Sequence, residues 1–312
     1  MTTAAQHPDR LAELPVWKEI LRTEEPLIGG RELDPVRDRG DTTRSLTLTL
    51  PSEVTHPLLT SVPGAFHAGV NDILLSGLAL AVLEWRRRWG GTGSQVLVDL
   101  EGHGREEILP GTDLTRTVGW FTSMYPVRLD PGEYDRSDVW AGGSGMGRTV
   151  KRIKEQLRAF PDNGMGFGML RHLHPETARE LSGLAAPQIG FNYLGRFAAS
   201  EEAAAQDWDM APDATLPSGH DPRMPVTHAL VINAVTEDHA DGPRLSGTWN
   251  WPEGLLTEQD VRDLAESWFT ALTALVAHCE DQGAGGHTPS DLSLGSLSQD
   301  EIDELEAELE MP

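Results

Sequence analysis

The segment VLVDLEGHGRE, residues 96–106, is the stretch around which the rest of the chain can be interpreted. It opens as a short apolar run with β-branched residues and closes on two glycines, which predicts a buried strand that breaks into a tight turn. Glu101 stands at the end of this strand, where a carboxylate can face a cleft and still be held rigidly. Gly102 and Gly104 allow a sharp turn and the close approach of another molecule. We therefore expect Glu101 either to exchange protons with a substrate or to act as a structural partner of Arg105.

Composition excludes several classes of function. The 312 residues include 25 basic and 49 acidic side chains, a formal net charge of −24, which argues against nucleic acid or an anionic membrane as the main partner. Cys279 is the only cysteine, so an internal disulfide and a cysteine-based metal cluster are excluded, and scattered histidines such as His172 and His174 predict no metal site. The N-terminus lacks the apolar core of a signal peptide and no apolar run approaches the length of a bilayer span, so we expect a cytoplasmic protein.

Hydrophobic periodicity indicates a mixed α/β fold. Helices are expected over 9–22, over 71–89 with Asn71 as its cap, and from a capping box at 257–260. Strands are expected over 45–50, 96–101, 117–129, 188–195, 226–235 and 244–251. The last two strands read as an antiparallel pair, and Pro126 places its segment at a sheet edge or a bulge. Because these elements alternate without a strict βαβ rhythm, we predict an α/β sandwich on a mixed sheet.

The helix expected over 148–160 is the most concentrated basic element of this acidic chain. Its charged residues are five cations and one acid: Arg148, Lys151, Arg152, Lys154, Arg158 and Glu155. One interpretation is a solvated helix face whose cations pair with acids elsewhere in the protein. The other is a docking surface for an acidic or phosphorylated partner.

Five motifs, in this order along the chain, point to a known family. They are NDILL at 71–75, EGHGRE at 101–106, RTVGWFTSMYP at 116–126, PDNGMGFG at 161–168 and FNYLG at 191–195. This set resembles the later core motifs of nonribosomal peptide synthetase epimerization domains, which belong to the condensation-domain superfamily. The resemblance covers about residues 10–308. It implies a lobe like that of chloramphenicol acetyltransferase, an α/β sandwich with a mixed, largely antiparallel sheet and packed helices.

One motif of that family is missing. Such domains have two lobes, and the first ends in a His-His-x-x-x-Asp-Gly motif whose second histidine serves as acid or base. No two histidines are adjacent in this chain, and His287 and Asp291, although correctly spaced, lie in a tail linker without the other members of the motif. We therefore interpret the chain as a second lobe. We divide it into an N-terminal helix and connecting segment (1–43), the C-terminal lobe of a condensation/epimerization-type domain (44–282), and a linker with an acidic C-terminal helix (283–312).

The resemblance implies a substrate and a set of site residues. The substrate would be an aminoacyl or peptidyl thioester on the phosphopantetheine arm of a peptidyl carrier protein, with no cofactor bound by the chain itself. Glu101 would transfer the α-proton, and Asn192 and Tyr193 would hydrogen-bond the thioester carbonyl or position Glu101. Further candidates for contact with substrate or phosphopantetheine are His103, Arg105, Trp120, Phe121, Thr122, Arg148, Lys151 and Arg152. For several of these a structural role is the alternative: His103 and Arg105 would brace the turn, and Trp120 and Phe121 would belong to the core or to the wall of a tunnel.

Three interpretations of function stay open. The first is half of a split epimerase, completed by a partner chain that brings the histidine lobe. The second is a non-catalytic interaction lobe that binds a carrier protein or another synthetase component. The third is an altered enzyme that uses Glu101 alone. In each case the surface that would meet a second lobe leads us to expect a stable partner chain or a homo-oligomer.

Overall fold

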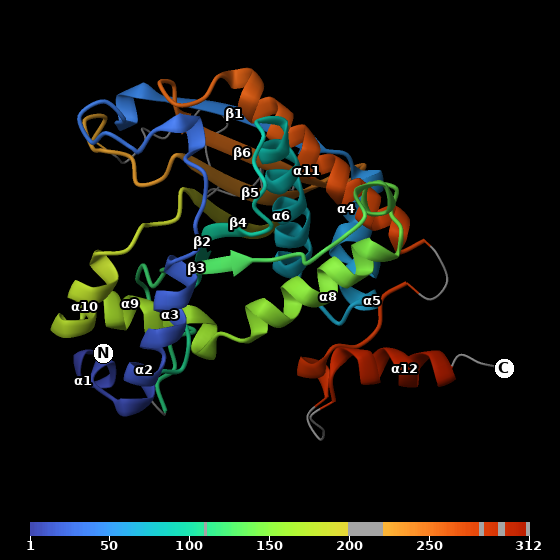
Figure 1. Cartoon of the computed structure of the whole chain (residues 1–312), viewed down its shortest axis with the longest axis horizontal. Helices are drawn as coiled ribbons and strands as arrows, with labels where there is room; N and C mark the ends of the chain where they lie inside the picture. The colour runs from blue at the N-terminus through green and yellow to red at the C-terminus, as the bar shows by residue number, and fades with distance from the viewer. Residues whose placement is uncertain (109–110, 199–220, 281–283, 293–296, 310–312) are drawn as a thin grey trace.

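A six-stranded sheet forms the centre of the computed structural model, which describes residues 1–108, 111–198, 221–280, 284–292 and 297–309 (Figure 1). The strands follow the spatial order β1-β6-β5-β4-β2-β3. Their bounds are Thr43–Leu50 for β1, Val96–Gly102 for β2, Ser123–Leu129 for β3, Ile189–Ala198 for β4, Leu230–His239 for β5 and Gly242–Pro252 for β6. All six strands predicted from the sequence are present, with their ends shifted by a few residues.

The sheet is mixed, as predicted. Strand β4 runs parallel to both of its neighbours, β5 and β2, whereas β1–β6, β5–β6 and β2–β3 are antiparallel. The expected antiparallel pair at 226–235 and 244–251 is confirmed as β5 and β6. Strand β3 is an edge strand, which agrees with the position of Pro126 within it.

Two long helices cover one face of the sheet. Helix α6 (Val70–Arg88) is buried from Asp72 to Arg86, and α11 (Glu258–His278) packs along it (Figure 1). Trp268 of α11 joins the two helices, because its indole N–H donates to the Leu74 carbonyl at 3.0 Å. Its ring also meets the strand residue Trp249 edge to face at 5.7 Å between centroids, which anchors α11 on the sheet.

The other helices surround this two-layer core. Near β3 lie α1 (Thr2–Ala5), α2 (Pro8–Ala12), α3 (Leu14–Leu21), α9 (Met165–His172) and α10 (Pro175–Ser182). Beyond α6 lie α4 (Ser52–Leu59), α5 (Ser61–Ala65), α7 (Arg136–Trp140), α8 (Ser144–Arg158) and α12 (Gln299–Leu309). Short 3₁₀ turns are η1 (Ile28–Gly30), η2 (Gly40–Thr42), η3 (Pro161–Gly164) and η5 (Pro289–Asp291).

Local differences from the sequence predictions have identifiable causes. The helix expected over 9–22 is divided into α2 and α3, and Pro15 lies in the first turn of α3, where its missing N–H is tolerated. Gly69, not Asn71, caps α6, because the Asp72 carboxylate accepts the Gly69 N–H at 2.7 Å. The glycine-rich motif at 161–168 forms the turn η3 and the start of α9. Residues 117–122 precede β3 and are not part of it.

The helices of the fold are short or insufficiently apolar when set against the thickness of a bilayer. In the described ranges no single helix is long and apolar enough to cross one, and Ser52–Ala65 and Val70–Arg88 reach that length and apolarity only together, across a 105° bend.

The tail is fastened to the core through a buried lysine of α8. Lys154 is fully buried, and its ammonium donates to the Phe66 carbonyl at 2.9 Å and to Asp291 of η5 at 2.5 Å. Burial alone would raise the pKa of Asp291, but the hydrogen bonds from Lys154 and the Thr288 N–H outweigh it, so the pKa lies below its ordinary value. The division at residue 283 stays a prediction, although the tail makes specific contacts with the lobe.

We predict that Lys154→Met lowers the free energy of unfolding by about 3–5 kcal/mol near neutral pH, because it leaves the Asp291 carboxylate without its buried partner. Urea denaturation measures this change. The matched control is Lys18→Met, which removes a partly exposed pair with Glu180 and should cost less than about 1 kcal/mol.

The same pair predicts a pH dependence. Since the pKa of Asp291 is lower in the folded state, the stabilisation is present above the ordinary value near 3.8 and is lost as pH falls through the folded value. The difference between the native protein and Lys154→Met should therefore shrink below about pH 4. A difference that stays constant down to pH 2 would contradict this assignment.

Candidate active site

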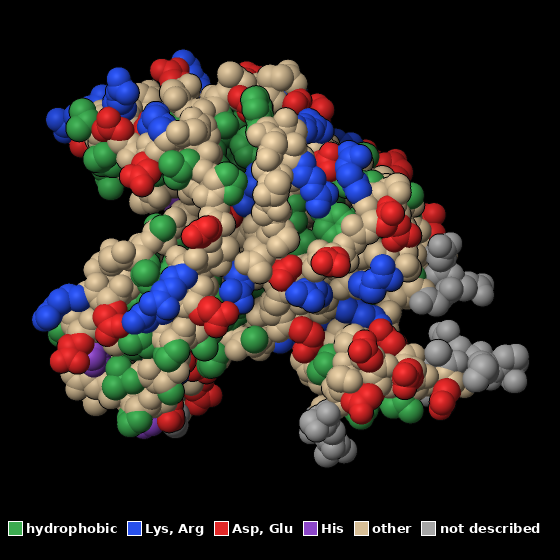
Figure 2. All heavy atoms as spheres, in the orientation of Figure 1, with side chains coloured by type: hydrophobic (Ala, Val, Ile, Leu, Met, Phe, Trp, Pro, Cys, Tyr) green, Lys and Arg blue, Asp and Glu red, His purple; other side chains and the backbone are tan. Residues whose placement is uncertain are grey.

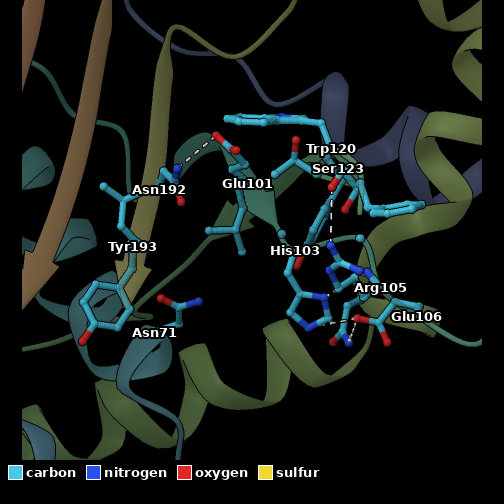
Figure 3. A pocket seen from close by; sticks show the side chains of 18 residues that line it. Asn71, Glu101, His103, Arg105, Glu106, Trp120, Ser123, Asn192 and Tyr193 are labelled. Carbon is cyan, nitrogen blue, oxygen red and sulfur yellow. Dashed lines mark hydrogen bonds and ion pairs between the residues drawn. The ribbon is translucent and has the colours of Figure 1, made fainter. Parts of the chain in front are cut away.

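A pocket opens where strand β2 ends beside residues 192–194 of the parallel strand β4 (Figure 3). Its volume is about 570 Å³. Strand β2 and the following turn supply one wall, the segment 119–125 supplies another, and β4 supplies a third. The lining brings together most of the predicted site residues: Glu101, His103, Arg105, Trp120, Phe121, Thr122, Asn192 and Tyr193.

Glu101 is held at the pocket by an amide from the adjacent strand. The side-chain amide nitrogen of Asn192 donates to the Glu101 carboxylate at 3.1 Å, and both side chains are half-buried (Figure 3). Within the described parts of the chain the second carboxylate oxygen of Glu101 has no donor, so it can act as an acceptor. The arrangement gives a rigidly placed carboxylate that is still open to the pocket, which is the geometry a proton acceptor needs.

Tyr193 lies on the other side of its strand. Its hydroxyl is 3.0 Å from the Thr236 hydroxyl on β5, and its ring packs against the buried core. The residue still lines the pocket, but Figure 3 shows the phenol turned away from Glu101. Of the two adjacent residues, Asn192 alone is thus bonded to the Glu101 carboxylate.

The turn after β2 is held by its own side chains. The Arg105 N–H donates to Nδ1 of His103 at 3.0 Å, and Nε2 of His103 lies 3.5 Å from the Glu106 carboxylate. Gly104 has a φ of +64°, and a Cβ at this position would overlap the Phe121 carbonyl. The turn therefore requires glycine there, both for the left-handed backbone and for the close approach.

Arg105 is not a partner of Glu101. Its guanidinium donates to the carbonyls of Leu114, Thr117 and Gly119 and lies 4.6 Å from the centre of the Phe121 ring. The residue therefore braces the segment that forms the second wall of the pocket. This arrangement removes the structural alternative for Glu101 that was considered from the sequence.

The outer rim of the pocket is apolar and exposed. Val118 is fully exposed and Trp120 is 91% exposed, so the tryptophan is not a core residue. Other exposed large apolar side chains on the same strands and loop are Met124, Leu194 and Phe197. Trp120 and Leu194 line the pocket itself, and Val118 and Met124 are next in sequence to residues that line it. Isolated exposed apolar residues are common, but several near one opening are typical of a surface that another molecule covers.

The three basic candidates of α8 lie away from this pocket. Lys151 pairs with Asp303 at 2.8 Å and with Glu306 at 3.6 Å, both on α12, and Arg152 pairs with Asp130 at 3.0 Å. Arg148 contacts Ser144 and has no carboxylate partner among the described residues. Figure 2 shows the acidic side chains of α12 gathered beside this basic helix. The structure thus gives Lys151 and Arg152 internal acidic partners and does not bring any of the three to the wall of the pocket.

The sequence analysis missed other residues of the lining. Asn71 enters the pocket from the first turn of α6 (Figure 3), and its side-chain amide oxygen is buried without a partner in the described parts of the chain. Tyr125 lies beneath the turn, and burial raises the pKa of its phenol to about 12. Asn163 donates to Glu106 at 2.9 Å. All three belong to the motifs quoted above. The sequence predicts a capping role for Asn71 because asparagine is a preferred residue at a helix N-cap.

The tail histidine His287, which has the spacing to Asp291 seen in the missing motif, lies away from the pocket, and the described residues form no metal cluster. They contain no group of three or more histidine, cysteine, aspartate or glutamate side chains arranged to hold a metal. His287 pairs with Glu306 in the tail at 2.9 Å and stacks on His67, and neither histidine lines the pocket.

Comparison with known proteins agrees with this architecture. The family model described as "Condensation domain" matches residues 2–294. The chain is 35% identical over 297 residues to a linear gramicidin synthase of Brevibacillus parabrevis, which is 92% of this chain and 4% of that protein. It is 30% identical over 309 residues to tyrocidine synthase 1 of the same organism, 96% of this chain and 27% of that protein. The chain thus spans a small part of the length of these synthetases.

Solved structures give the same fold. The epimerization domain from the third module of tyrocidine synthetase B superposes with a TM-score of 0.70 at 30% identity, over 89% of this chain and 57% of that one. The X-domain from teicoplanin biosynthesis superposes with a TM-score of 0.57 at 19% identity, over 89% of this chain and 56% of that one. At this level of identity the likeness concerns the fold alone. From the motifs, the fold and the match over residues 2–294, the chain belongs to the condensation-domain family of nonribosomal peptide synthetases.

Proposed function

We propose that the chain is half of a split epimerase that inverts the α-carbon of an aminoacyl or peptidyl thioester carried on phosphopantetheine. The observation that carries the proposal is Glu101, fixed by Asn192 at the mouth of an open pocket. Two further observations support it: the EGHGRE and FNYLG motifs that line the pocket, and the likeness to a solved epimerization domain. A peptidyl carrier protein would present the substrate, so the chain itself would need no resident cofactor.

Inversion requires proton transfer on both faces of the α-carbon. In the proposed reaction the free oxygen of Glu101 takes the α-proton, and the electron pair of the broken C–H bond moves into the enolate of the thioester. A histidine of a partner lobe then delivers a proton to the opposite face. Removal of one of two such groups costs about 10²–10⁴-fold in rate, so we expect the chain alone to be nearly inactive.

The test is α-proton exchange on a panel of aminoacyl thioesters loaded on a phosphopantetheinylated carrier protein in D₂O. With a lobe ending in His-His-x-x-x-Asp-Gly present, Glu101→Gln should lower the rate of deuterium uptake by about 10²–10⁴-fold, because it removes the proton acceptor while keeping the hydrogen bond to Asn192. Mass spectrometry measures the uptake. Glu107→Gln, an exposed acid of the same loop, is the matched control and should leave the rate unchanged. Exchange that persists in Glu101→Gln would eliminate the split-epimerase function.

The exposed apolar rim supports a partner chain. A second lobe seated on the pocket would cover Val118 and Trp120, which are among the most exposed large apolar side chains in the described residues. Burial of such side chains contributes about 1.5–3 kcal/mol each. The same surface could be covered by a second copy of the chain.

We therefore predict that the double variant Val118→Ser/Trp120→Ser associates at least tenfold more weakly with the histidine lobe, or with itself, because it removes this apolar contribution. Analytical ultracentrifugation measures both forms of association. Val36→Ser, at a position that is 76% exposed and does not line the pocket, is the control. Unchanged association in the double variant would show that the rim is not the interface.

The alternative is a non-catalytic lobe that binds a carrier protein through the basic helix α8. Carrier binding would then survive Glu101→Gln and weaken when Arg148, Lys151 and Arg152 are neutralised. The internal ion pairs argue against this alternative, because Lys151 and Arg152, two of the three cations, already have acidic partners.

A further inference from the structure

A buried histidine lies on the same side of the sheet as Glu101. His228 lies two residues before the start of β5 and is 6% exposed. Its Nε2 is 2.9 Å from the carboxylate of Asp99, and its Nδ1 is 3.0 Å from the exposed hydroxyl of Thr227. Asp99 stands two residues before Glu101 on β2, and side chains two apart on a strand share a face. The imidazole and the Glu101 carboxylate therefore belong to one face of β2.

The His228–Asp99 bond passes over the intervening strand β4. Asp99 pairs in register with Gly190 of β4, and a Cβ on Gly190 would lie 3.2 Å from Nδ1 of His228. Real side chains rarely approach so closely, so the absence of a side chain at Gly190 lets the imidazole cross β4 and reach β2. Two residues further along the same strand, Asn192 makes the equivalent bond to Glu101.

These two side-chain bonds lie where the backbone pairing is shortest. The β2–β4 ladder has three paired residues, Val98 with Ile189, Asp99 with Gly190 and Leu100 with Phe191. Glu101 follows the last of these pairs. No backbone pair with β4 fixes Glu101 itself. Its position relative to β4 therefore depends on two side-chain bonds, that of Asp99 before the last pair and that of Glu101 after it.

We infer that His228 and Asp99 are positioning residues for Glu101: their hydrogen bond across Gly190 fixes the spacing of β2 and β4 that lets Asn192 hold the Glu101 carboxylate at the pocket. The inference deepens the proposed function and rests on it for its catalytic consequence. The geometric consequence can be measured without any activity, because the side-chain amide of Asn192 reports its own hydrogen bond.

The first experiment follows the side-chain amide signal of Asn192 by ¹⁵N NMR of the full chain, assigned with Asn192→Asp. His228→Leu removes the bond to Asp99, and we expect the Asn192 signal to shift toward the free amide position. His228→Gln keeps a donor for Asp99 and should restore the native signal. Asp99→Leu is a second route, which removes the acceptor with a side chain of similar branched shape, and it should shift the signal in the same direction as His228→Leu.

The matched control is His278→Leu. His278 is also buried and donates from its Nδ1 to the Gly142 carbonyl at 3.0 Å, but it lies in α11 and does not contact β2 or β4. This variant should lower the melting temperature as His228→Leu does and leave the Asn192 signal in place. If His228→Leu and Asp99→Leu also left that signal in place, the pair would have a stabilising role only and the inference would be overturned.

The second experiment uses the exchange assay with the histidine lobe. We expect His228→Leu to lower kcat at least tenfold with KM unchanged, and His228→Gln to recover most of the loss. If Glu101→Gln abolishes exchange and His228→Leu does not change it, the inference fails while the proposed function stands. If the Asn192 signal responds but exchange is independent of Glu101, the positioning stands and the proposed function fails.

Discussion

The parallel pairing of β2 with β4 is the constraint on which the site depends. It sets the carboxyl end of β2 beside Asn192 in the first half of β4, and the crevice beyond the carboxyl end of a strand is a usual place for a ligand in a parallel sheet. Only three residue pairs make this ladder. Strand β2 has its antiparallel partner β3 on the other side, so Glu101 is fixed by β3 through the backbone and by β4 mainly through Asn192.

Most of the fold could be predicted from the sequence because each element carries its own periodic signal. Helix α6 is apolar on most faces and is buried as that composition requires. The sequence did not predict local structure correctly where a residue type commonly has two structural roles. Asn71 reads as a cap, yet Gly69 with Asp72 caps the helix and Asn71 enters the pocket. Glycine-rich segments usually form loops, yet residues 161–168 form a turn and the start of a helix. Gly164 lies against the ring of Tyr125, and Phe167 packs on Trp17.

The site was predictable in part for a related reason. A motif identifies Glu101, and strand alternation alone implies that Asn192 and Tyr193, being adjacent, face opposite sides of β4. Which of them meets Glu101 depends on how β4 lies beside β2, and that is not local information. The His228–Asp99 bond is harder still, because 129 residues separate its members and neither lies in a recognised motif. Buried polar contacts of this kind are set by tertiary structure and leave no periodic trace.

The basic helix α8 shows how the same charges can serve the fold instead of a partner. In a chain with a net charge of −24, an isolated cluster of cations attracts the protein's own acids first. Lys154 has Asp291, Lys151 has Asp303, and Arg158 has Asp72. An acidic carrier protein would compete for Lys151 with α12, which is tethered to the same chain and therefore present at a high effective concentration. Binding through Lys151 would then require α12 to move first, whereas Arg148, with no carboxylate partner among the described residues, would be open to contact from the start.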